Sequence, residues 1–593
     1  MAKQSKNGNG NSKALSTQQA VNAAVYSACN IMRRSNCAGA LQYVPELTWI
    51  LFLRILDERE HAEAAEADAL GLPFTPSLAA SYRWRDWAAP YDKREDPPAA
   101  AAQQTQGWKR RELQEGQTFN GFINFVNQEL LPRLRALRDR ADATPRQKVI
   151  SEIMSGVERV RIDTEKNLLD VLDRVHDISE QNIDTTHVFP LSQIFEGLLL
   201  KMGEKGNDGG QFFTPREVIR AMVKVVNPQL GERVYDPACG TGGFLAQAFE
   251  HMFEAHKEHI SGEQLDTLKH RTFYGREKDN IIYPIGLANL VLHGIDEPHI
   301  WHGNALTEAE TYGGLFNGAP ALYEVILMNP PFGGKEGKEA QTRFAYQTGA
   351  TQVLFLQHII NSLREGGRCG LVIDEGSMFR TNETAFVQTK RKLLDDCDLW
   401  CVVSLPGGVF TSAGAGVKTN LLFFTKGKPT EKIWYYDLSD IKVGKKTPFM
   451  LDRFADFFRL LPDRADSERS WTVDINARRD EAKRQADPLR EQARKPEAKA
   501  DALREQIKDL KRQKPPAPAE TLRDLTVKVS ALDAEARELK AKAQSIEDAV
   551  FDLKAVNPNA KTDEDTRTPR ELLDLIEAKG REVAAALATL RNL

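Results

Sequence analysis

The stretch VYDPACGTGGFL (234–245) decides the fold class of this chain. It joins a short β-branched strand, expected to end at Asp236, to a glycine-rich turn and then to a helix that begins near Phe244. Glycines let a backbone approach a ligand closely, and a helix start offers free amide donors and a positive dipole end. The stretch therefore predicts a cofactor-binding loop at the carboxyl end of a strand. The loop residues are Gly240, Thr241, Gly242 and Gly243.

The acid before the turn indicates which ligand the loop takes. A dinucleotide fingerprint, G-x-G-x-x-G, would need a third glycine where this sequence has Leu245. A carboxylate at Asp236 would also repel a pyrophosphate. It suits a ligand that carries an ammonium group, such as the methionine end of S-adenosylmethionine.

Outward from this loop, β-branched runs alternate with helical segments from about residue 165 to 440. The candidate strands are 233–238, 272–277, 325–330, 368–374, 399–406 and 420–426. This alternation predicts an α/β domain with parallel strands and helices on both faces, and such sheets bind ligands at the carboxyl ends of their strands. Glu277 ends the second strand, where a carboxylate can accept both hydroxyls of a ribose.

A third motif, Asn329-Pro330-Pro331-Phe332, follows the apolar strand VILM and indicates the reaction. The prolines fix the backbone so that the Asn329 side-chain oxygen and the Pro330 carbonyl can face one NH₂ group. Two acceptors draw the nitrogen lone pair toward a methyl sulfonium, so that alignment supplies the acceleration and no metal is needed. Phe332 offers a face on which an extracted base can stack. We expect methyl transfer to an exocyclic amine, with adenine in DNA as the substrate.

The flanking regions differ from this domain in composition and in hydrophobic pattern. Residues 1–16 are polar and glycine-rich and predict a disordered tail, whereas 17–164 predict an N-terminal helical domain. Within it, 81–113 mixes tryptophans (Trp84, Trp87 and Trp108) with arginines. This mixture suits either nucleic-acid contact or packing of a loop onto the helices.

After the α/β domain, expected at 165–470, residues 471–593 predict a helical region. Two helical runs are separated by KPPAPAE (514–520), and we expect Pro488 and Pro496 to interrupt the first. Apolar residues from Leu522 to Leu553 alternate three and four apart, which predicts a coiled coil, formed either within the chain or with a partner's helices. A last helix begins at Thr568-Pro569 with a capping box.

Composition narrows the choice of partners. The chain has 593 residues, of which 41% are hydrophobic. Its net charge is −4, so DNA binding requires either a local basic surface or a partner that supplies one. Its six cysteines lack paired C-x-x-C spacing. No apolar run reaches the roughly 18 residues of a membrane span and no leader opens the chain, so we expect a cytoplasmic protein without membrane contact.

These motifs together resemble a known family. DPACGTGG with NPPF resembles the DNA amino-methyltransferases, and QFFTPREV, GREKD and LPGGVF…GAGVKTNLLFF make the chain similar, over about residues 20 to 430, to the modification subunit of type I restriction-modification systems. The resemblance implies a Rossmann-like S-adenosylmethionine-dependent methyltransferase domain that methylates adenine N6. It also implies the residues that surround the cofactor: Gln211, Phe212, Phe213, Thr214, Pro215 and Arg216 as a cover, the glycine loop at the methionine end, Glu277 at the ribose, and Asn304 and Ala305 at the adenine. Relatives commonly have an acid where this chain has Asn304.

The resemblance further implies partners. We find no target-recognition segment after residue 426, so specificity is expected in a separate DNA-specificity subunit docked on the C-terminal helices. Double-stranded DNA is the expected substrate, and a second copy and a restriction subunit are possible companions. Two alternatives stay open at this point: an amino-methyltransferase for rRNA or protein glutamine, and a non-catalytic cofactor-binding scaffold. The intact Asn329, Pro330 and Phe332 disfavour a scaffold.

Overall fold

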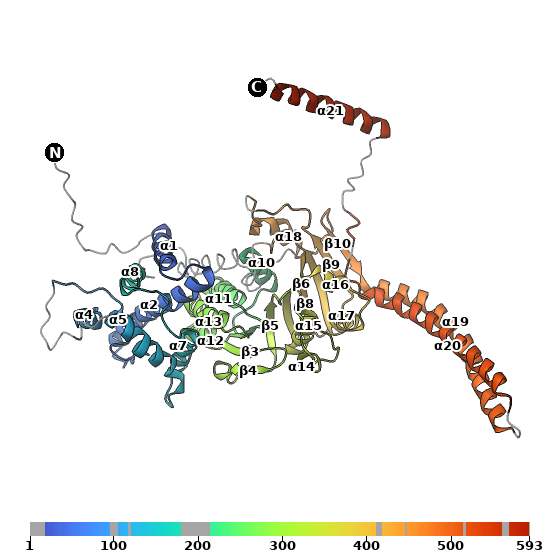
Figure 1. The fold of residues 1–593 in the computed structure, drawn as a ribbon, viewed down its shortest axis with the longest axis horizontal. Helices are drawn as coiled ribbons and strands as arrows, with labels where there is room; N and C mark the ends of the chain where they lie inside the picture. The colour runs from blue at the N-terminus through green and yellow to red at the C-terminus, as the bar shows by residue number, and fades with distance from the viewer. Residues whose placement is uncertain are drawn as a thin grey trace.

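The chain folds into a helical unit, a central α/β domain and a projecting helical arm, as seen in a computed structural model (Figure 1). The structure describes residues 18–94, 103, 105–116, 120–178, 214–410, 418–444, 447–513, 517–554, 556–559 and 568–591. The expected N-terminal tail lies outside these residues. Within the described part, no helix is both long enough and apolar enough to cross a bilayer.

The N-terminal unit is helical, as predicted. It contains α1 (Gln18–Arg34), α2 (Ala40–Ala69), α3 (Trp84–Trp87), α4 (Trp108–Glu115), α5 (Gly121–Phe125), α6 (Leu131–Arg135), α7 (Pro145–Ser155) and α8 (Glu165–His176). Helix α8 buries one apolar face, which includes Leu168 and Leu172, and packs against α1 and α2. The helical unit therefore extends past the expected boundary at residue 164.

The aromatic and basic stretch of this unit packs inward. Trp84 and Trp87 are fully buried, and the indole of Trp108 donates to Asp86 (Nε1 to Oδ1, 3.1 Å). The guanidinium of Arg110 is also buried and donates to the carbonyl oxygen of Ala88 at 2.8 Å. Packing against the helices accounts for Trp84 and Trp87, which cannot stack on bases, whereas Trp108 is only half-buried.

The α/β domain is built on one ten-stranded sheet in the order β10-β9-β7-β8-β6-β5-β1-β2-β3-β4. Its strands are β1 (Val234–Asp236), β2 (Phe273–Glu277), β3 (His299–Asn304), β4 (Ala309–Tyr312), β5 (Tyr323–Met328), β6 (Leu363–Asp374), β7 (Cys397–Ser404), β8 (Thr419–Lys426), β9 (Lys432–Asp437) and β10 (Ser470–Asp474). The strands β2, β1, β5 and β6 are parallel neighbours, as predicted, and β3, which was not among the candidate strands, joins them in parallel beside β2.

The expected parallel pairing is wrong at β8, and the sheet also has two edge strands, β4 and β10, that were not among the candidate strands. Strand β8 runs antiparallel to both β6 and β7, and the edge strands β4 and β10 are also antiparallel. A parallel pairing of β7 and β8 would need a crossover, usually a helix. The glycine-rich sequence between Ser404 and Thr419 carries no helical pattern, so β8 reverses beside β7 instead.

Helices cover both faces of the sheet, which keeps its central strands buried. Val234 and Val325 face a core shared with α10 (Arg216–Val226), α11 (Gly243–His256) and α13 (Ile282–Leu292), whereas Tyr235 and Ile326 face α15 (Thr351–Ser362) and α17 (Thr384–Asp396). The remaining helices are α12 (Gly262–His270), α14 (Lys338–Gln341), α16 (Glu375–Phe379) and α18 (Ala455–Leu460). The carboxyl ends of the central strands stay free to form a site.

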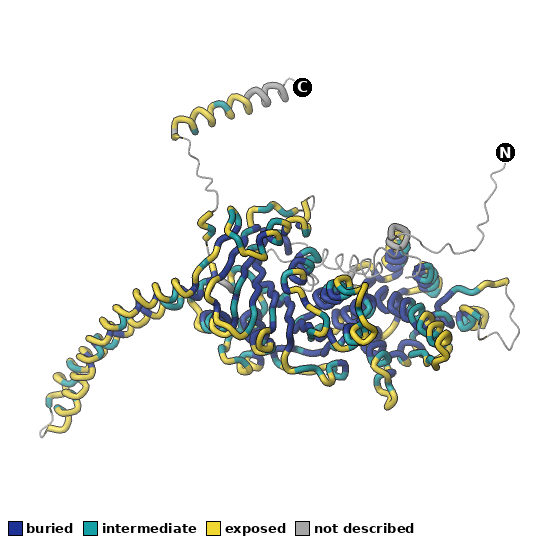
Figure 2. The backbone as a smooth tube through the Cα atoms, turned by 180° about the vertical axis from the view of Figure 1, so that it is seen from behind, coloured by how far each residue is buried: buried dark blue, intermediate teal, exposed yellow. Residues whose placement is uncertain are grey.

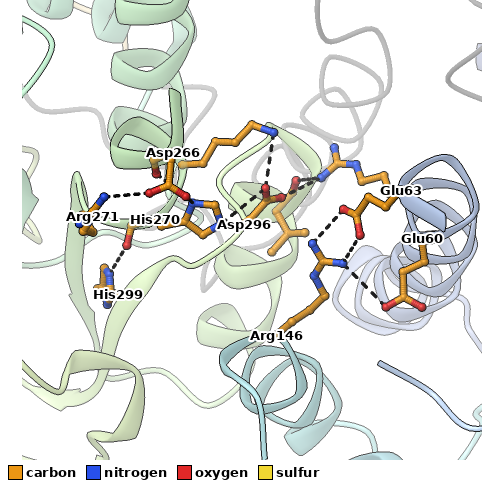
Figure 3. Close-up of polar contacts among 11 residues, drawn as sticks. Glu60, Glu63, Arg146, Asp266, His270, Arg271, Asp296 and His299 are labelled. Atoms are coloured by element: carbon orange, nitrogen blue, oxygen red, sulfur yellow. Dashed lines mark hydrogen bonds and ion pairs between the residues drawn. The ribbon is translucent and has the colours of Figure 1, made fainter. Parts of the chain in front are cut away.

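The helical unit docks on the α/β domain through α13, which packs against α2 and α7. Arg59 of α2 donates to two carbonyl oxygens at the C-terminal end of α13, at 2.7 and 3.3 Å. Beside it, Arg146 of α7 forms a two-bond pair with Glu63, and Asp296 lies close to Arg59 and Lys269 (Figure 3). Cations near a helix C-terminus oppose its negative dipole end. The unit is thus attached to a helix of the cofactor domain.

The C-terminal region forms a two-helix arm and a separate last helix. Helix α19 (Ile475–Arg512) and helix α20 (Ala519–Asp548) pack along each other, with a buried stripe between exposed surfaces (Figure 2). The buried residues include Ala486, Ala493 and Ala500 of α19 and Val529, Ala536 and Ala543 of α20, each set spaced by seven residues. The alternative of a hairpin within the chain is confirmed for this seam.

Two expectations for this region change. Pro488 and Pro496 lie inside a continuous α19, because packing along α20 outweighs the local cost of a missing N–H donor. The expected boundary at residue 470 falls inside the sheet, because β10 begins at Ser470.

After the arm, the chain returns to the core, where the Tyr435 hydroxyl donates to the Leu553 carbonyl at 3.0 Å. The last helix, α21 (Pro569–Arg591), has the predicted capping box at Thr568 and Glu571.

Candidate active site

A cavity of about 330 Å³ lies at the carboxyl ends of β1, β2, β3 and β5. The structure brings together there most of the residues predicted from the sequence, namely Thr214, Arg216, Asp236, Gly240, Thr241, Gly243, Glu277, Asn304, Ala305, Asn329, Pro331 and Phe332. Pro215 caps α10 at the cavity edge, and Gly242 and Pro330 lie within the lining loops. Gln211, Phe212 and Phe213 lie outside the described residues.

The glycine loop takes the conformation that its sequence requires. Gly240 and Gly242 have φ angles of 54° and 78°, in the left-handed region that favours glycine. A Cβ atom on Gly242 would come within 2.9 Å of the Leu290 side chain on α13. Helix α11 starts at Gly243, so its first amides face the cavity end of β1. The loop therefore offers backbone donors to a ligand.

Glu277 ties the loop to the end of β2. Its carboxylate accepts from the Gly240 amide at 2.9 Å and from the amides of Lys278 and Asp279, both at 2.8 Å. Burial raises the pKa of Glu277, although these backbone donors lower it. The side chain thus holds the loop in place while it lines the cavity.

Asp236 supplies a second buried carboxylate. It is 1% exposed and accepts from the Ala238 amide at 3.1 Å. Burial raises the pKa of Asp236 well above its usual range, and the nearby Glu277 carboxylate raises it further. Two buried acids favour a cationic ligand, because a positive charge offsets the cost of ionising them. A methionine end with its ammonium and sulfonium groups fits this site.

We expect cofactor binding to release protons, because a cationic ligand stabilises the ionised form of Asp236. Since burial raises the pKa of this carboxyl well above its usual range in the free protein, affinity should increase as the pH rises through that pKa. Calorimetry in buffers of different ionisation enthalpy measures the released protons directly. Asp236→Asn should remove the release, and an affinity independent of pH in the parent protein would contradict this account.

Asn304 holds its own turn. Its Oδ1 accepts from the Leu306 amide at 3.0 Å, and Ala305 behind it is buried. An acid at this position could accept the same bond, so the departure from the family pattern preserves the turn. The amide nitrogen of Asn304 remains a donor toward the cavity that it lines.

The Asn329 amide lies at the end of β5 with its two ends in different surroundings. Its Nδ2 donates to the hydroxyl of Thr214 at 2.9 Å. Its Oδ1 is buried and accepts no hydrogen bond from any residue that the structure describes. Phe332 packs edge-to-face on Phe410, with ring centroids 5.6 Å apart. The site thus holds an unsatisfied acceptor beside an aromatic ring.

Several lining residues were missed by the sequence analysis, among them Asn289 and Arg276. Asn289 of α13 is fully buried and donates to the Thr241 carbonyl at 2.8 Å, and Arg276 lies over the Trp301 ring, 4.6 Å from its centroid. A single asparagine in the apolar run IYPIGLANLVL was the available signal for Asn289. Arg276 had none, because an arginine on a strand more often lies at the surface.

Comparisons with known proteins agree with this geometry. Residues 187–483 match the model of the N-6 DNA Methylase family, and residues 21–175 match that of the HsdM N-terminal domain. The methylase subunit of the type I restriction enzyme EcoEI from Escherichia coli is 33% identical over 477 residues, which cover 77% of this chain and 87% of that one. The chain belongs to the family of type I restriction enzyme methylase subunits. It is accordingly an adenine-N6 DNA methyltransferase that uses S-adenosylmethionine.

Solved structures support the same assignment for the methylase subunit. A modification subunit assigned to a type I restriction enzyme of Vibrio vulnificus YJ016 is 32% identical, with a TM-score of 0.64, over 78% of this chain and 93% of that one. A chain from a study of complex assembly in a type I restriction-modification system is 31% identical, with a TM-score of 0.63, over 97% of this chain and 98% of that one. The family assignment argues against the rRNA, protein-glutamine and scaffold alternatives.

Proposed function

We propose that Asn329 and Pro330 form the catalytic acceptor pair of this methyltransferase. Asn329 Oδ1 and the Pro330 carbonyl each accept one hydrogen of the adenine N6 amine, which directs the nitrogen lone pair into the cavity. The buried, unsatisfied Oδ1 carries this proposal, because a buried acceptor without a partner costs about 1–3 kcal/mol unless a ligand satisfies it. When bound, S-adenosylmethionine supplies an electrophilic methyl group. The methyl–sulfur bond would break as the N–C bond forms, with the neutral thioether as the leaving group, and the methylated amine would then release one proton to water.

The target base must leave the helix to reach this pair. An adenine inside a duplex keeps its N6 amine within the base pair, so the nucleotide is extruded before reaction. Phe332 offers a ring for stacking, and its edge-to-face contact with Phe410 fixes the ring plane. Pro331 stiffens the backbone between the acceptors and the ring. The motif thus places acceptors and stacking face in one rigid unit.

The cofactor roles follow from the same cavity. We assign the loop 240–243 and Asp236 to the methionine end, Glu277 to the ribose, and Asn304 with Ala305 to the adenine. Thr214, Pro215 and Arg216 border the cavity at the start of α10, and we place Gln211, Phe212 and Phe213 beside them by family resemblance. Glu277 has the capacity for ribose hydroxyls in addition to its three backbone donors, since a carboxylate offers about four acceptor sites.

Glu277→Ala is expected to weaken S-adenosylmethionine binding by on the order of 1.5–3 kcal/mol. The loss combines the ribose contact with the amide that fixes the glycine loop. Isothermal calorimetry measures the change, and Glu277→Gln serves as the control that keeps the shape but removes the charge. An unchanged affinity in both variants would place the ribose contact elsewhere.

For its partners, we propose double-stranded DNA, a DNA-specificity subunit and, in the restriction complex, a second copy of this chain and a restriction subunit. The apolar face of α21 supports the docking role: Leu573 is 61%, Ile576 65% and Val583 58% exposed. These residues are three and seven apart and so share one side of the helix. The seam of the arm is already filled by its own two helices, whereas these three side chains of α21 are exposed. A net charge of −4 favours shared binding of DNA.

Reconstitution tests the proposal. The chain is purified with the proposed DNA-specificity subunit and incubated with cofactor and DNA, and the nucleosides are analysed by mass spectrometry. We expect N6-methyladenine at one sequence in DNA. Methyl groups found in RNA or protein, with none in DNA under the same conditions, would overturn the assignment of this site to adenine.

A further inference from the structure

The hydrogen bond between Thr214 and Asn329 joins two segments that are 115 residues apart in the chain. Asn329 Nδ2 lies 2.9 Å from Thr214 Oγ1, and both residues line the cavity. Thr214 is followed by Pro215, the N-cap of α10, and α10 packs on α11 and on β6. Arg216, at the start of α10, also pairs with Glu250 of α11 at 3.4 Å. The hydroxyl therefore has a fixed position relative to the end of β5.

The orientation of the Asn329 amide decides whether it can act. A side-chain amide has an acceptor at one end and a double donor at the other, and a half-turn about the last torsion exchanges them. With Oδ1 toward the cavity, the amide accepts from the substrate amine. With Nδ2 toward the cavity, two NH₂ groups would face each other as donors, and transfer would lose its alignment.

We propose that Thr214 is a positioning residue of the methyl transfer, whose hydroxyl accepts from Asn329 Nδ2 and so keeps Oδ1 directed at the substrate amine. This inference rests on the proposed role of Asn329 and adds a residue that acts through it. It assigns to Thr214 a function apart from covering the cofactor. The buried Oδ1 without a partner is the state that this bond maintains.

Three variants in the reconstituted complex test the hydrogen bond between Thr214 and Asn329, which we call the tether. Thr214→Val keeps the shape of the side chain and removes the hydroxyl, whereas Thr214→Ser keeps the hydroxyl and removes the methyl group. For each we measure the single-turnover rate at saturating cofactor, the cofactor Kd and the fluorescence of 2-aminopurine at the target position, which reports extrusion of the base. The third variant, Asn329→Asp, presents an oxygen to the substrate in both orientations of the group.

The tether predicts a specific pattern. At saturating cofactor, Thr214→Val should lower the single-turnover rate by about 10- to 100-fold, with base extrusion changed by less than about twofold, and Thr214→Ser should recover the rate to within about fivefold. In the Asn329→Asp background, Thr214→Val should cost less than about threefold, because orientation no longer matters. If Asn329→Asp is too slow to measure, the valine and serine comparison decides alone.

Two results would overturn the tether. The rate of Thr214→Val could recover fully at saturating cofactor, which would make Thr214 a cofactor contact only. The same loss could also appear in the Asn329→Asp background, which would show that Thr214 does not act through the amide. Both are distinct from failure of the catalytic proposal, in which Asn329→Ala itself would keep its rate.

Discussion

Asn329→Ala is expected to abolish methyl transfer while S-adenosylmethionine still binds. The change removes the acceptor that aligns the N6 amine, and the loss of alignment together with a hydrogen bond should cost at least about 3 kcal/mol in the transition state, a rate loss above about 100-fold. The cofactor loop, held by Glu277 and Asn289, does not depend on this side chain. Single-turnover methylation and calorimetry measure the two effects separately.

Asn304→Ala is the matched control. This asparagine lines the same cavity, but its carbonyl oxygen serves its own turn at the end of β3. We expect its loss to weaken cofactor binding and to leave most of the rate at saturating cofactor. If Asn329→Ala turned over within tenfold of the parent, the acceptor pair would be wrongly assigned, whatever the control showed.

Removal of α21 is expected to uncouple the methyltransferase from its specificity subunit. A chain that ends at residue 559 keeps the sheet, the arm and the return of the chain to the core at Leu553, so its cofactor affinity should change by less than about twofold. Its apolar docking face is gone, however, so co-purification with the specificity subunit and methylation at a defined sequence should both be lost. Size-exclusion chromatography and methylation mapping measure the two losses.

The truncation is placed at 559 because a cut at 470 would damage the α/β domain. Trp471 of β10 stacks on Tyr435 at 5.4 Å, and Phe551 and Leu553 are buried in the same core. A chain with a shortened arm but an intact α21 is the control, and we expect it to co-purify if α21 is the docking element. If the chain without α21 still modified one DNA sequence without a partner, specificity would reside in this subunit.

Much of the fold could be predicted because its signals are local. Strands β5, β7 and β8 contain short apolar runs, and α10, which precedes β1, has a clear apolar face. The failures came from interactions that are distant in sequence. The direction of β8 depends on its pairing with β6 and β7. The continuity of α19 through Pro488 and Pro496 depends on packing against α20. The burial of Trp84 and Trp87 depends on helices formed by later residues.

In the site, too, the features set by local sequence could be predicted and those set by distant residues could not. The glycine loop, Glu277 and Asn329 stand directly after strands, where ligand contacts are expected, and the cavity collects them. Asn289 escaped notice because it lies in mid-helix and reaches the loop only through the close packing of α13. The orientation of the Asn329 amide could not be predicted either, because it depends on a hydroxyl contributed by a segment far away in the chain.

The arm has a repeating construction that makes its length adjustable. The ion pairs Arg490–Glu547, Glu497–Lys540 and Arg504–Asp533 step by seven residues along each helix, as do the small residues between them. Both helices are attached to the α/β domain at the same end of the arm. The first residue of α19 follows β10, and the last residue of α20 leads into the segment that returns to the core at Leu553. Removing or adding one heptad in each helix would therefore move the tip by about 10 Å without changing the register of the remaining pairs. Insertions or deletions of one heptad in both helices would therefore change the distance from the catalytic domain to the tip of the arm without changing the catalytic domain itself.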